Sequence, residues 1–198
     1  MDGRNIALIA VTPRWGYKIL RWFAELNALE SVIRREFHLF LLLSGGRPTA
    51  TKSARLEHFD PRRRVLHIPK PKGGEHRAFD IPLSREMIRC LIRAIRAGRM
   101  LHPKQAAEWI FAADSRSGHL EEHKESRNIL SKWGNDLRQS YRTLATIAGV
   151  SEIDAKLLMN HAIPGVNGGY ITRHSLVENH LRTQQQAISN VIMKSRGS

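Results

Sequence analysis

Three short stretches of the chain combine side chains that could act together on a phosphate group. Arg47 follows a Ser-Gly-Gly turn, Arg138 stands three residues after Asn135, and His161 precedes Tyr170 by nine residues. A guanidinium can bind two oxygens of an oxyanion at once, so a pair of arginines suits a phosphate that gains negative charge during a reaction. A tyrosine hydroxyl, with a pKa of about 10, becomes a nucleophile where positive charge and a proton acceptor favour its ionised form.

The order and spacing of these stretches resemble the catalytic signature of the tyrosine recombinases, specifically the phage-type integrases. In that family a glycine turn presents a first arginine, a His-x-x-Arg motif presents a second, and a Leu-Gly-His segment precedes the nucleophilic tyrosine. Here Leu-Leu-Met-Asn-His at 157–161 takes the place of that last segment. The resemblance extends from Trp15 to Met193, nearly the whole chain.

The resemblance implies site-specific DNA recombination, the integration or excision of a mobile element, by cleavage and rejoining of strands. Arg47 and Arg138 would hold the phosphate, and His161 would hydrogen-bond one of its oxygens. Tyr170 would attack the phosphorus to give a covalent 3′-phosphotyrosine. Asn135 is kept in the catalytic set as the partner of Arg138.

The family supplies the proton for the leaving 5′ oxygen from a lysine on a hairpin. Lys72, immediately before Gly73-Gly74, matches that place, and Lys70 is the other candidate. A lysine beside arginines and partly removed from water has a lowered pKa, which suits a general acid. We expect no metal and no cofactor, because cationic side chains take the role that magnesium has elsewhere.

Two positions depart from the family pattern. Asn135 stands where the motif usually has histidine, and its amide can hydrogen-bond a phosphate but cannot accept a proton as an imidazole does. Ala50 replaces the acidic residue commonly found three places after the first arginine, which removes a partner for the site. The alternative function is therefore a catalytically decayed DNA-binding fragment of an integrase, without strand cleavage.

Two further enzyme classes compete with this interpretation. The stretch from His119 to His123 fits the His-x-x-Glu-His pattern of zinc hydrolases, in which two histidines share one helical face. It lies in a polar stretch, with Glu152 and Glu178 as the downstream candidates for a third ligand. A metal-dependent nuclease would need clustered carboxylates, and the six aspartates are scattered. We rank both classes below the recombinase.

Composition favours a folded protein with a polyanionic partner. Lys and Arg total 32 against 18 Asp and Glu, a formal net charge of +14, while 41% hydrophobic residues are enough for a core. The single cysteine, Cys90, excludes an internal disulfide and a four-cysteine zinc module. The apolar runs are too short to cross a bilayer, and we expect a cytoplasmic protein.

The elements that must position these residues follow from apolar spacing and from cap and turn signals. Two strands, at 65–68 and 78–81, are expected to form a hairpin around Pro71 and Gly73-Gly74. The pattern therefore predicts a mostly α fold with a small antiparallel β-sheet (α+β). Helices are predicted at 15–29, 32–43, 48–55, 84–98, 126–148, from Ser151 onward and at 175–193, with a polar loop over 114–125.

The resemblance assigns residues 1–198 to a single catalytic domain, and we expect the N-terminal core-binding domain of longer family members to be absent. The implied partners are double-stranded DNA and other recombinase protomers in a DNA-bound tetramer, together with accessory DNA-bending or directionality proteins. The helix at 175–193 would dock on a neighbouring protomer, and its alternative role is to cover the core of its own chain.

Overall fold

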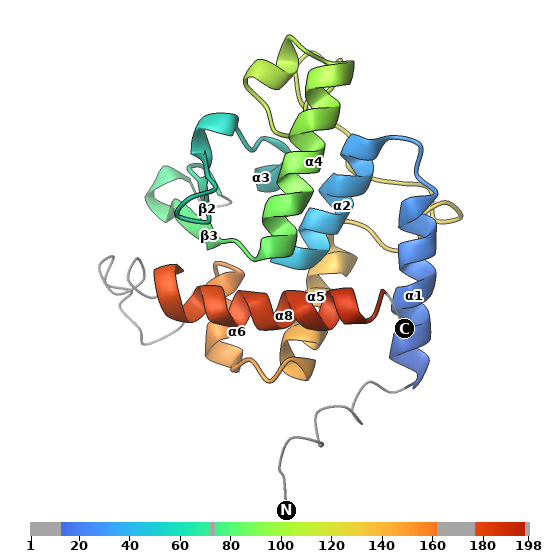
Figure 1. The fold of residues 1–198 in the computed structure, drawn as a ribbon, viewed down its shortest axis with the longest axis vertical. Helices are drawn as coiled ribbons and strands as arrows, with labels where there is room; N and C mark the ends of the chain where they lie inside the picture. The colour runs from blue at the N-terminus through green and yellow to red at the C-terminus, as the bar shows by residue number, and fades with distance from the viewer. Residues whose placement is uncertain (1–12, 72–73, 162–176, 197–198) are drawn as a thin grey trace, which may run out of the picture.

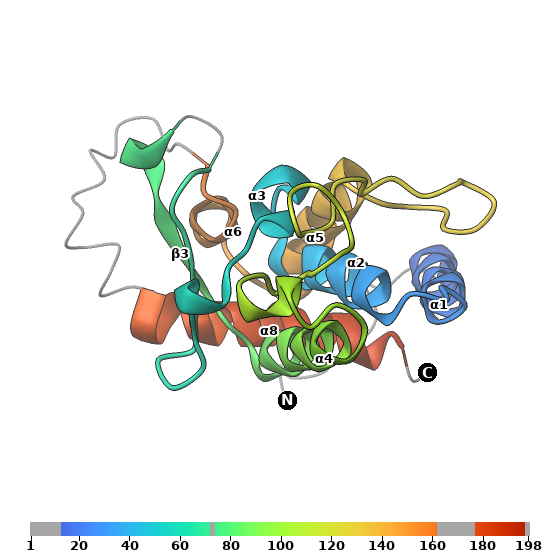
Figure 2. The ribbon, with the colours of Figure 1, turned by 90° about the horizontal axis from the view of Figure 1, so that it is seen from above.

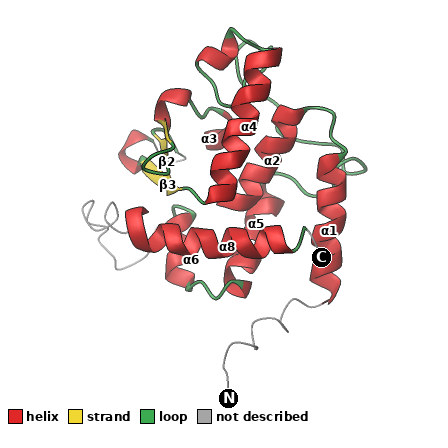
Figure 3. Ribbon diagram, in the orientation of Figure 1, coloured by secondary structure: helices red, strands yellow, loops and turns green. Residues whose placement is uncertain are grey.

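The computed structural model describes residues 13–71, 74–161 and 177–196 (Figure 1). Seven α-helices and one three-stranded antiparallel sheet form within these residues, so the predicted α+β class is confirmed (Figure 3). The helices are α1 (Pro13–Asn27), α2 (Val32–Ser44), α3 (Pro48–Lys52), α4 (Arg85–Leu101), α5 (Asn135–Ile147), α6 (Glu152–Leu158) and α8 (Arg182–Lys194), and the strands are β1 (Phe59–Asp60), β2 (Val65–Ile68) and β3 (Phe79–Pro82).

Helix α2 forms the centre of the core. Its apolar run from Leu39 to Leu43 is buried throughout, and the helix contacts α1, α4, α5 and α8 (Figure 1). Ser31 caps its start, because the Ser31 hydroxyl accepts a hydrogen bond of 3.3 Å from the Arg34 amide. Since neighbours surround α2, the turn that follows Ser44 has a fixed position.

The sheet lies on the opposite side of the molecule from α1 (Figure 2). Its strand order is β1-β2-β3, with Val65 paired to Pro82 and Ile68 to Phe79, so the predicted β2–β3 hairpin is confirmed. Strand β1 was not predicted, because its two residues are too few to show an alternating pattern.

Helix α4 continues through Gly98, the residue at which the sequence predicts its end. Gly98 is buried, and a Cβ there would lie 3.4 Å from the Cβ atoms of Ala106 and Ala112, so the glycine lets the returning chain pack closely. The amide of His102 then donates to the Gly98 carbonyl at 2.7 Å, which closes the last turn. Within the described residues, no helix is long and apolar enough to cross a membrane.

The helix predicted over 126–148 begins only at Asn135. The residues before it are held by α1 instead, because the Ser131 amide donates to the Glu25 carboxylate at 2.8 Å. Gly134, with a φ of 58°, stands directly before the helix. The apolar spacing of this segment is helical, but a tertiary contact takes the place of the intrahelical hydrogen bonds.

Helix α8 covers the core of its own chain, which is the alternative role given to the predicted terminal helix. A π-helical turn at Val177–Leu181 leads into α8, and Ile188 is fully buried among contacts with α5 and α2. The buried side chain of Gln185 accepts a hydrogen bond of 2.9 Å from the Tyr141 hydroxyl and donates one of 2.8 Å to the Leu43 carbonyl. The first two residues of the predicted helix lie outside the described ranges.

Candidate functional site

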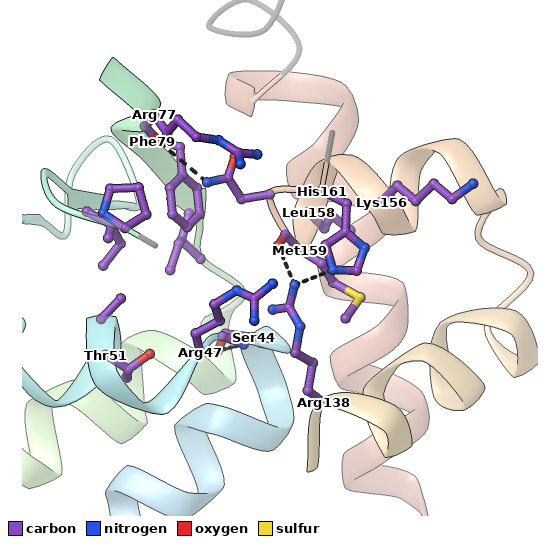
Figure 4. A pocket seen from close by; sticks show the side chains of 16 residues that line it. Ser44, Arg47, Thr51, Arg77, Phe79, Arg138, Lys156, Leu158, Met159 and His161 are labelled. Atoms are coloured by element: carbon purple, nitrogen blue, oxygen red, sulfur yellow. Dashed lines mark hydrogen bonds between the residues drawn. The ribbon is translucent and has the colours of Figure 1, made fainter. Parts of the chain in front are cut away.

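A cavity of about 510 Å³ is lined by the β2–β3 hairpin, the start of α3 and the end of α6 (Figure 4). Three of the six predicted catalytic residues line it, namely Arg47, Arg138 and His161. Figure 4 shows the guanidiniums of Arg47, from the turn before α3, and Arg138, from α5, approaching the same space. The fold therefore brings two arginines and a histidine together from three separate segments.

Arg47 is placed by the turn that ends α2. Gly45 adopts the left-handed conformation, with a φ of 60°, and its amide donates to the Leu41 carbonyl at 3.0 Å. A Cβ on Gly45 would lie 2.5 Å from the Tyr141 ring, so the close packing here requires a glycine. Pro48 then occupies the first position of α3. The exposed Arg47 is thus held between two helices, and no carboxylate of the described residues forms an ion pair with it.

Arg138 is the buried member of the set, only 6% exposed. Its guanidinium donates to the carbonyl of Gly45, to the carbonyl of Met159 at 2.8 Å, and to Nε2 of His161 at 2.6 Å (Figure 4). Gly45 and Met159 are the C-cap residues of α2 and α6, whose last carbonyls lack intrahelical partners and carry partial negative charge. Three of the five guanidinium hydrogens are used in this way, which leaves two for a ligand.

The positive charge of Arg138 is not neutralised by a carboxylate of the described residues. Burial, and then the positive charges of Arg47 and Arg142, lower the pKa of Arg138 to about 10. The group is still a cation at neutral pH. Because no described carboxylate pairs with it, an anion in the cavity would stabilise a charge that is costly to bury.

His161 is presented by the turn that ends α6. Asn160 takes the left-handed conformation, with a φ of 53°, at the position of the glycine in the family's Leu-Gly-His segment. Asparagine is one of the few residues that adopt this conformation readily. The amide of His161 donates to the Lys156 carbonyl at 2.9 Å, and the amide of Asn160 donates to the Leu157 carbonyl at 3.0 Å, a Schellman ending.

The imidazole of His161 is neutral in this arrangement. Arginine has only donors, so Nε2 of His161 accepts the hydrogen bond from Arg138. Burial, and then the charges of Arg138 and Arg47, lower the pKa of His161. Nδ1 therefore carries the ring hydrogen and remains a possible donor to a ligand.

The described lining of this cavity is cationic. It includes no carboxylate, and Phe79, Ile68 and Ile81 give it an apolar wall on the hairpin side. Its positively charged members are Arg47, Arg77, Arg138 and Lys156. Lys156 also forms an ion pair of 2.8 Å with Glu152, and Figure 4 shows its side chain extending away from the two arginines. The arrangement is suited to an anionic ligand.

Asn135, which the sequence places beside Arg138 in the catalytic set, lines a different cavity. This second cavity, of about 560 Å³, shares Arg47, Ala50 and Pro71 with the first one. Asn135 is the exposed first residue of α5, while Arg138, in the same helix, is buried and lines the first cavity. The two residues are three positions apart in α5, as the helical spacing predicted, but they line two adjoining cavities that share Arg47.

Lys72 and Tyr170 lie outside the described residues, so the structure gives no position for either. Lys70, the other candidate for the proton donor, lines the second cavity and forms an ion pair of 2.7 Å with Glu75. Ala50 lines both cavities, where a carboxylate at its position would face the arginines.

Arg77, Lys156 and Asn160 also line the first cavity and were not among the predicted site residues. Arg77 lies just before β3, Lys156 is in α6, and Asn160 follows the end of α6. The amide group of Asn160 donates to the Arg77 carbonyl at 3.5 Å, which links α6 to the hairpin. Asn160 lies within the motif at 157–161 and Lys156 directly precedes it, so the motif was the available signal for both. For Arg77 the sequence offered no signal other than the cluster of positive charge on the hairpin.

The His-x-x-Glu-His stretch does not form the helix that the zinc interpretation needs. His119 makes an isolated antiparallel bridge with Ala112, and residues 120–126 are irregular. Its two histidines therefore do not share a helical face. Across the described ranges, no group of three or more His, Cys, Asp or Glu is arranged to hold a metal ion.

Comparison with known proteins leaves the family open. No family model matches the sequence, and neither a curated protein nor a solved structure matches the chain.

Proposed function

We propose that this chain is the catalytic domain of an integrase-type tyrosine recombinase, which cleaves and rejoins DNA strands in site-specific recombination. One observation carries the proposal: Arg47, Arg138 and His161 line a single cationic cavity whose described lining has no carboxylate. Attack on a phosphodiester passes through a phosphorane with added negative charge. Two guanidiniums and a histidine are the groups that stabilise such a state.

Arg138, Arg47 and His161 would each contact the phosphate in a different way. Arg138 is buried and bonded to two carbonyls, so its guanidinium is already oriented before a ligand arrives. Arg47 is exposed and can close on a second oxygen. His161, neutral and fixed by Arg138, offers its Nδ1 hydrogen to the same phosphate.

The chemical step follows from the resemblance of the sequence and uses Tyr170 and Lys72. The Tyr170 oxygen forms a bond to phosphorus while the bond from phosphorus to the 5′ oxygen breaks, and Lys72 gives a proton to that leaving oxygen. Rejoining is the reverse reaction, in which the 5′ hydroxyl displaces the tyrosine without ATP. The cationic side chains supply the charge stabilisation, so the step requires no metal or cofactor.

The composition supports DNA as the partner. A formal charge of +14 attracts polyanions, and binding through phosphates is strongly dependent on salt. In this proposal the chain acts within a tetramer of recombinase protomers on DNA, in the cytoplasm, with accessory DNA-bending or directionality proteins.

A second candidate function is DNA binding without cleavage, by a decayed integrase fragment. Two observations favour it. Ala50 places no carboxylate beside the arginines, and Asn135 lines the neighbouring cavity and cannot accept a proton. Such a fragment would bind DNA through the same cations, and its DNA binding would not change when the hydroxyl of Tyr170 is removed.

The test is covalent capture on supercoiled plasmid. The protein is incubated with DNA at low salt in EDTA and quenched with SDS, and adducts of DNA with protein are counted for the wild type, Tyr170→Phe and the control Tyr17→Phe. We expect adducts with the wild type and the control and none with Tyr170→Phe. Binding without adducts in all three proteins would reject the recombinase and support the decayed fragment.

A further inference from the structure

Three arginines from three separate segments lie at the end of the β2–β3 ladder, apart from both cavities. Arg64 directly precedes β2, Arg85 begins α4 and Arg182 begins α8. Figure 1 shows β3 leading into the start of α4 directly above α8. None of the three arginines lines the first or the second cavity. The group is therefore a concentration of positive charge separate from the candidate site.

The side chain of Gln186 joins these three segments. Its oxygen accepts a hydrogen bond of 3.4 Å from the Arg64 guanidinium and one of 3.0 Å from the Arg85 amide. Arg182 lies four residues before Gln186, on the same face of α8. The amide nitrogen of Gln186 donates to the Glu86 carboxylate at 2.7 Å. A neutral side chain, and not a carboxylate, therefore holds the arginines near one another.

The positive charges of this group are only partly balanced. Burial, and then the charges of Arg182 and Arg85, lower the pKa of Arg64, with Glu86 opposing them. Within the described residues, no carboxylate forms an ion pair with any of the three arginines. Nε of Arg182 is also shielded from solvent and has no hydrogen-bond partner. Neighbouring like charges destabilise one another, and an anion between them would be stabilising.

The backbone at Arg64 is unusual for an arginine. Its φ is 59°, in the left-handed region that glycine and asparagine adopt most readily. The turn itself is stabilised by the Asp60 carboxylate, which accepts hydrogen bonds from the Arg62 and Arg63 amides at 2.9 and 2.8 Å. Nε of Arg64 donates to the Leu83 carbonyl at 3.2 Å, toward the start of α4. An arginine in a strained position that the turn does not require points to a use for its side chain.

We propose that Arg64, Arg85 and Arg182 form a binding site for a phosphate group, in addition to the candidate site. Guanidiniums bind phosphate oxygens through charge-assisted hydrogen bonds, and arginines from three segments can reach different oxygens of one phosphate. Arg89, one turn after Arg85 on the exposed side of α4, extends the positive surface. The inference does not rest on the proposed function, because it uses no residue of either cavity.

The first test compares the binding of inorganic phosphate by the wild type, Arg64→Asn and Arg62→Asn. Asparagine accepts the left-handed backbone, so Arg64→Asn removes the guanidinium without straining the turn. Arg62→Asn is the matched control, because it removes an exposed charge from the same turn, whereas the charges that act on Arg64 are those of Arg182, Arg85 and Glu86. Arg182→Gln is a second variant, which removes a guanidinium from another segment and leaves the turn intact.

The readout is the Nε–H resonance of Arg182, followed by NMR as phosphate is added at constant ionic strength and assigned from Arg182→Lys. We expect a saturable shift in the wild type and in Arg62→Asn, with affinity about tenfold lower in Arg64→Asn, the loss of a hydrogen bond between charged groups. For Arg182→Gln, phosphate affinity is read from the Nε–H resonance of Arg64 and should fall similarly. An Arg182 signal that phosphate does not move, or equal affinities of Arg64→Asn and Arg62→Asn, would overturn the inference.

A second test identifies the source of the phosphate. The affinity for a fluorescent DNA duplex is measured at several salt concentrations for the wild type, Arg64→Asn and Arg62→Asn. If the site takes a phosphate of the DNA backbone, Arg64→Asn should reduce the slope of log K against log salt by about one, and Arg62→Asn should not. An unchanged slope, together with the phosphate-dependent Arg182 signal, assigns the site to a smaller phosphorylated ligand. The proposed function is decided separately, by the Tyr170 adducts.

Discussion

The guanidinium of Arg138 lies 2.6 Å from Nε2 of His161, and the same group donates to the carbonyls of Gly45 and Met159. One side chain therefore joins the end of α2, the start of α5 and the end of α6. Because these contacts are buried, Arg138 builds the cavity as well as giving it charge.

Replacing Arg138 with lysine tests this structural role. A lysine ammonium cannot reproduce the planar fork that serves two carbonyls and an imidazole, so at least one buried acceptor loses its donor. We expect Arg138→Lys to lower the free energy of unfolding by about 1–3 kcal/mol, measured by urea denaturation. The control is Arg142→Lys, an exposed position one turn later on α5. Equal stability of the two variants would contradict the role given to Arg138.

The close packing of the turn at Gly45 leads to a second prediction about stability. Gly45→Ala would place a methyl group 2.5 Å from the Tyr141 ring in a left-handed backbone, whereas Gly149, with a φ of 74°, has nothing within 4 Å of the added Cβ. Gly149→Ala should therefore lower the free energy of unfolding only by the backbone strain, about 1–2 kcal/mol. Gly45→Ala should lower it by more than that, because the core must also shift. The comparison needs the urea midpoints of both variants. Equal losses would show that the Tyr141 contact is not restrictive.

Local signals in the sequence were sufficient for much of the fold. Ser84 and Ser151 were predicted to open helices, and each accepts a hydrogen bond from the amide three residues later, at 3.2 and 3.1 Å. The late start of α5 was not predictable in this way, because the contact between Glu25 and Ser131 joins residues 106 positions apart.

The same difference between local signals and long-range contacts applies to the candidate site. Arg47 and His161 follow the ends of α2 and α6, Arg138 is the fourth residue of α5, and the structure gathers the three in one cavity. Asn135 was assigned by helical spacing to the same face as Arg138; both are in α5, but Asn135 lines the second cavity and Arg138 the first.

The neutral state of His161 predicts a dependence of stability on pH. Its pKa is lowered in the folded protein, so between the folded value and the ordinary value near 6.5 the unfolded chain binds more protons. Stability is therefore complete above that ordinary value and falls as the pH drops below it. His58 and His123, whose pKa values are also lowered, contribute with the same sign.

The measurement is the free energy of unfolding at about pH 7.5 and about pH 5. We expect the wild type to lose more stability over this interval than His161→Asn, since the variant no longer carries a proton-binding group beside Arg138. The exposed His76→Asn serves as the comparison. The pH interpretation fails if His161→Asn and the wild type lose stability in parallel.

The salt dependence of DNA binding tests whether Arg47 contacts a phosphate. Each neutralised phosphate adds close to one unit to the slope of log K against log salt, so Arg47→Gln should reduce that slope by about one and weaken binding to all sequences alike. Arg99→Gln removes an exposed charge from the last turn of α4, outside both cavities, and controls for the loss of net charge. Titrations of a fluorescent duplex at several salt concentrations give the slopes. If Arg99→Gln lowers the slope as much as Arg47→Gln, the binding reflects the overall charge of +14 and not the cavity.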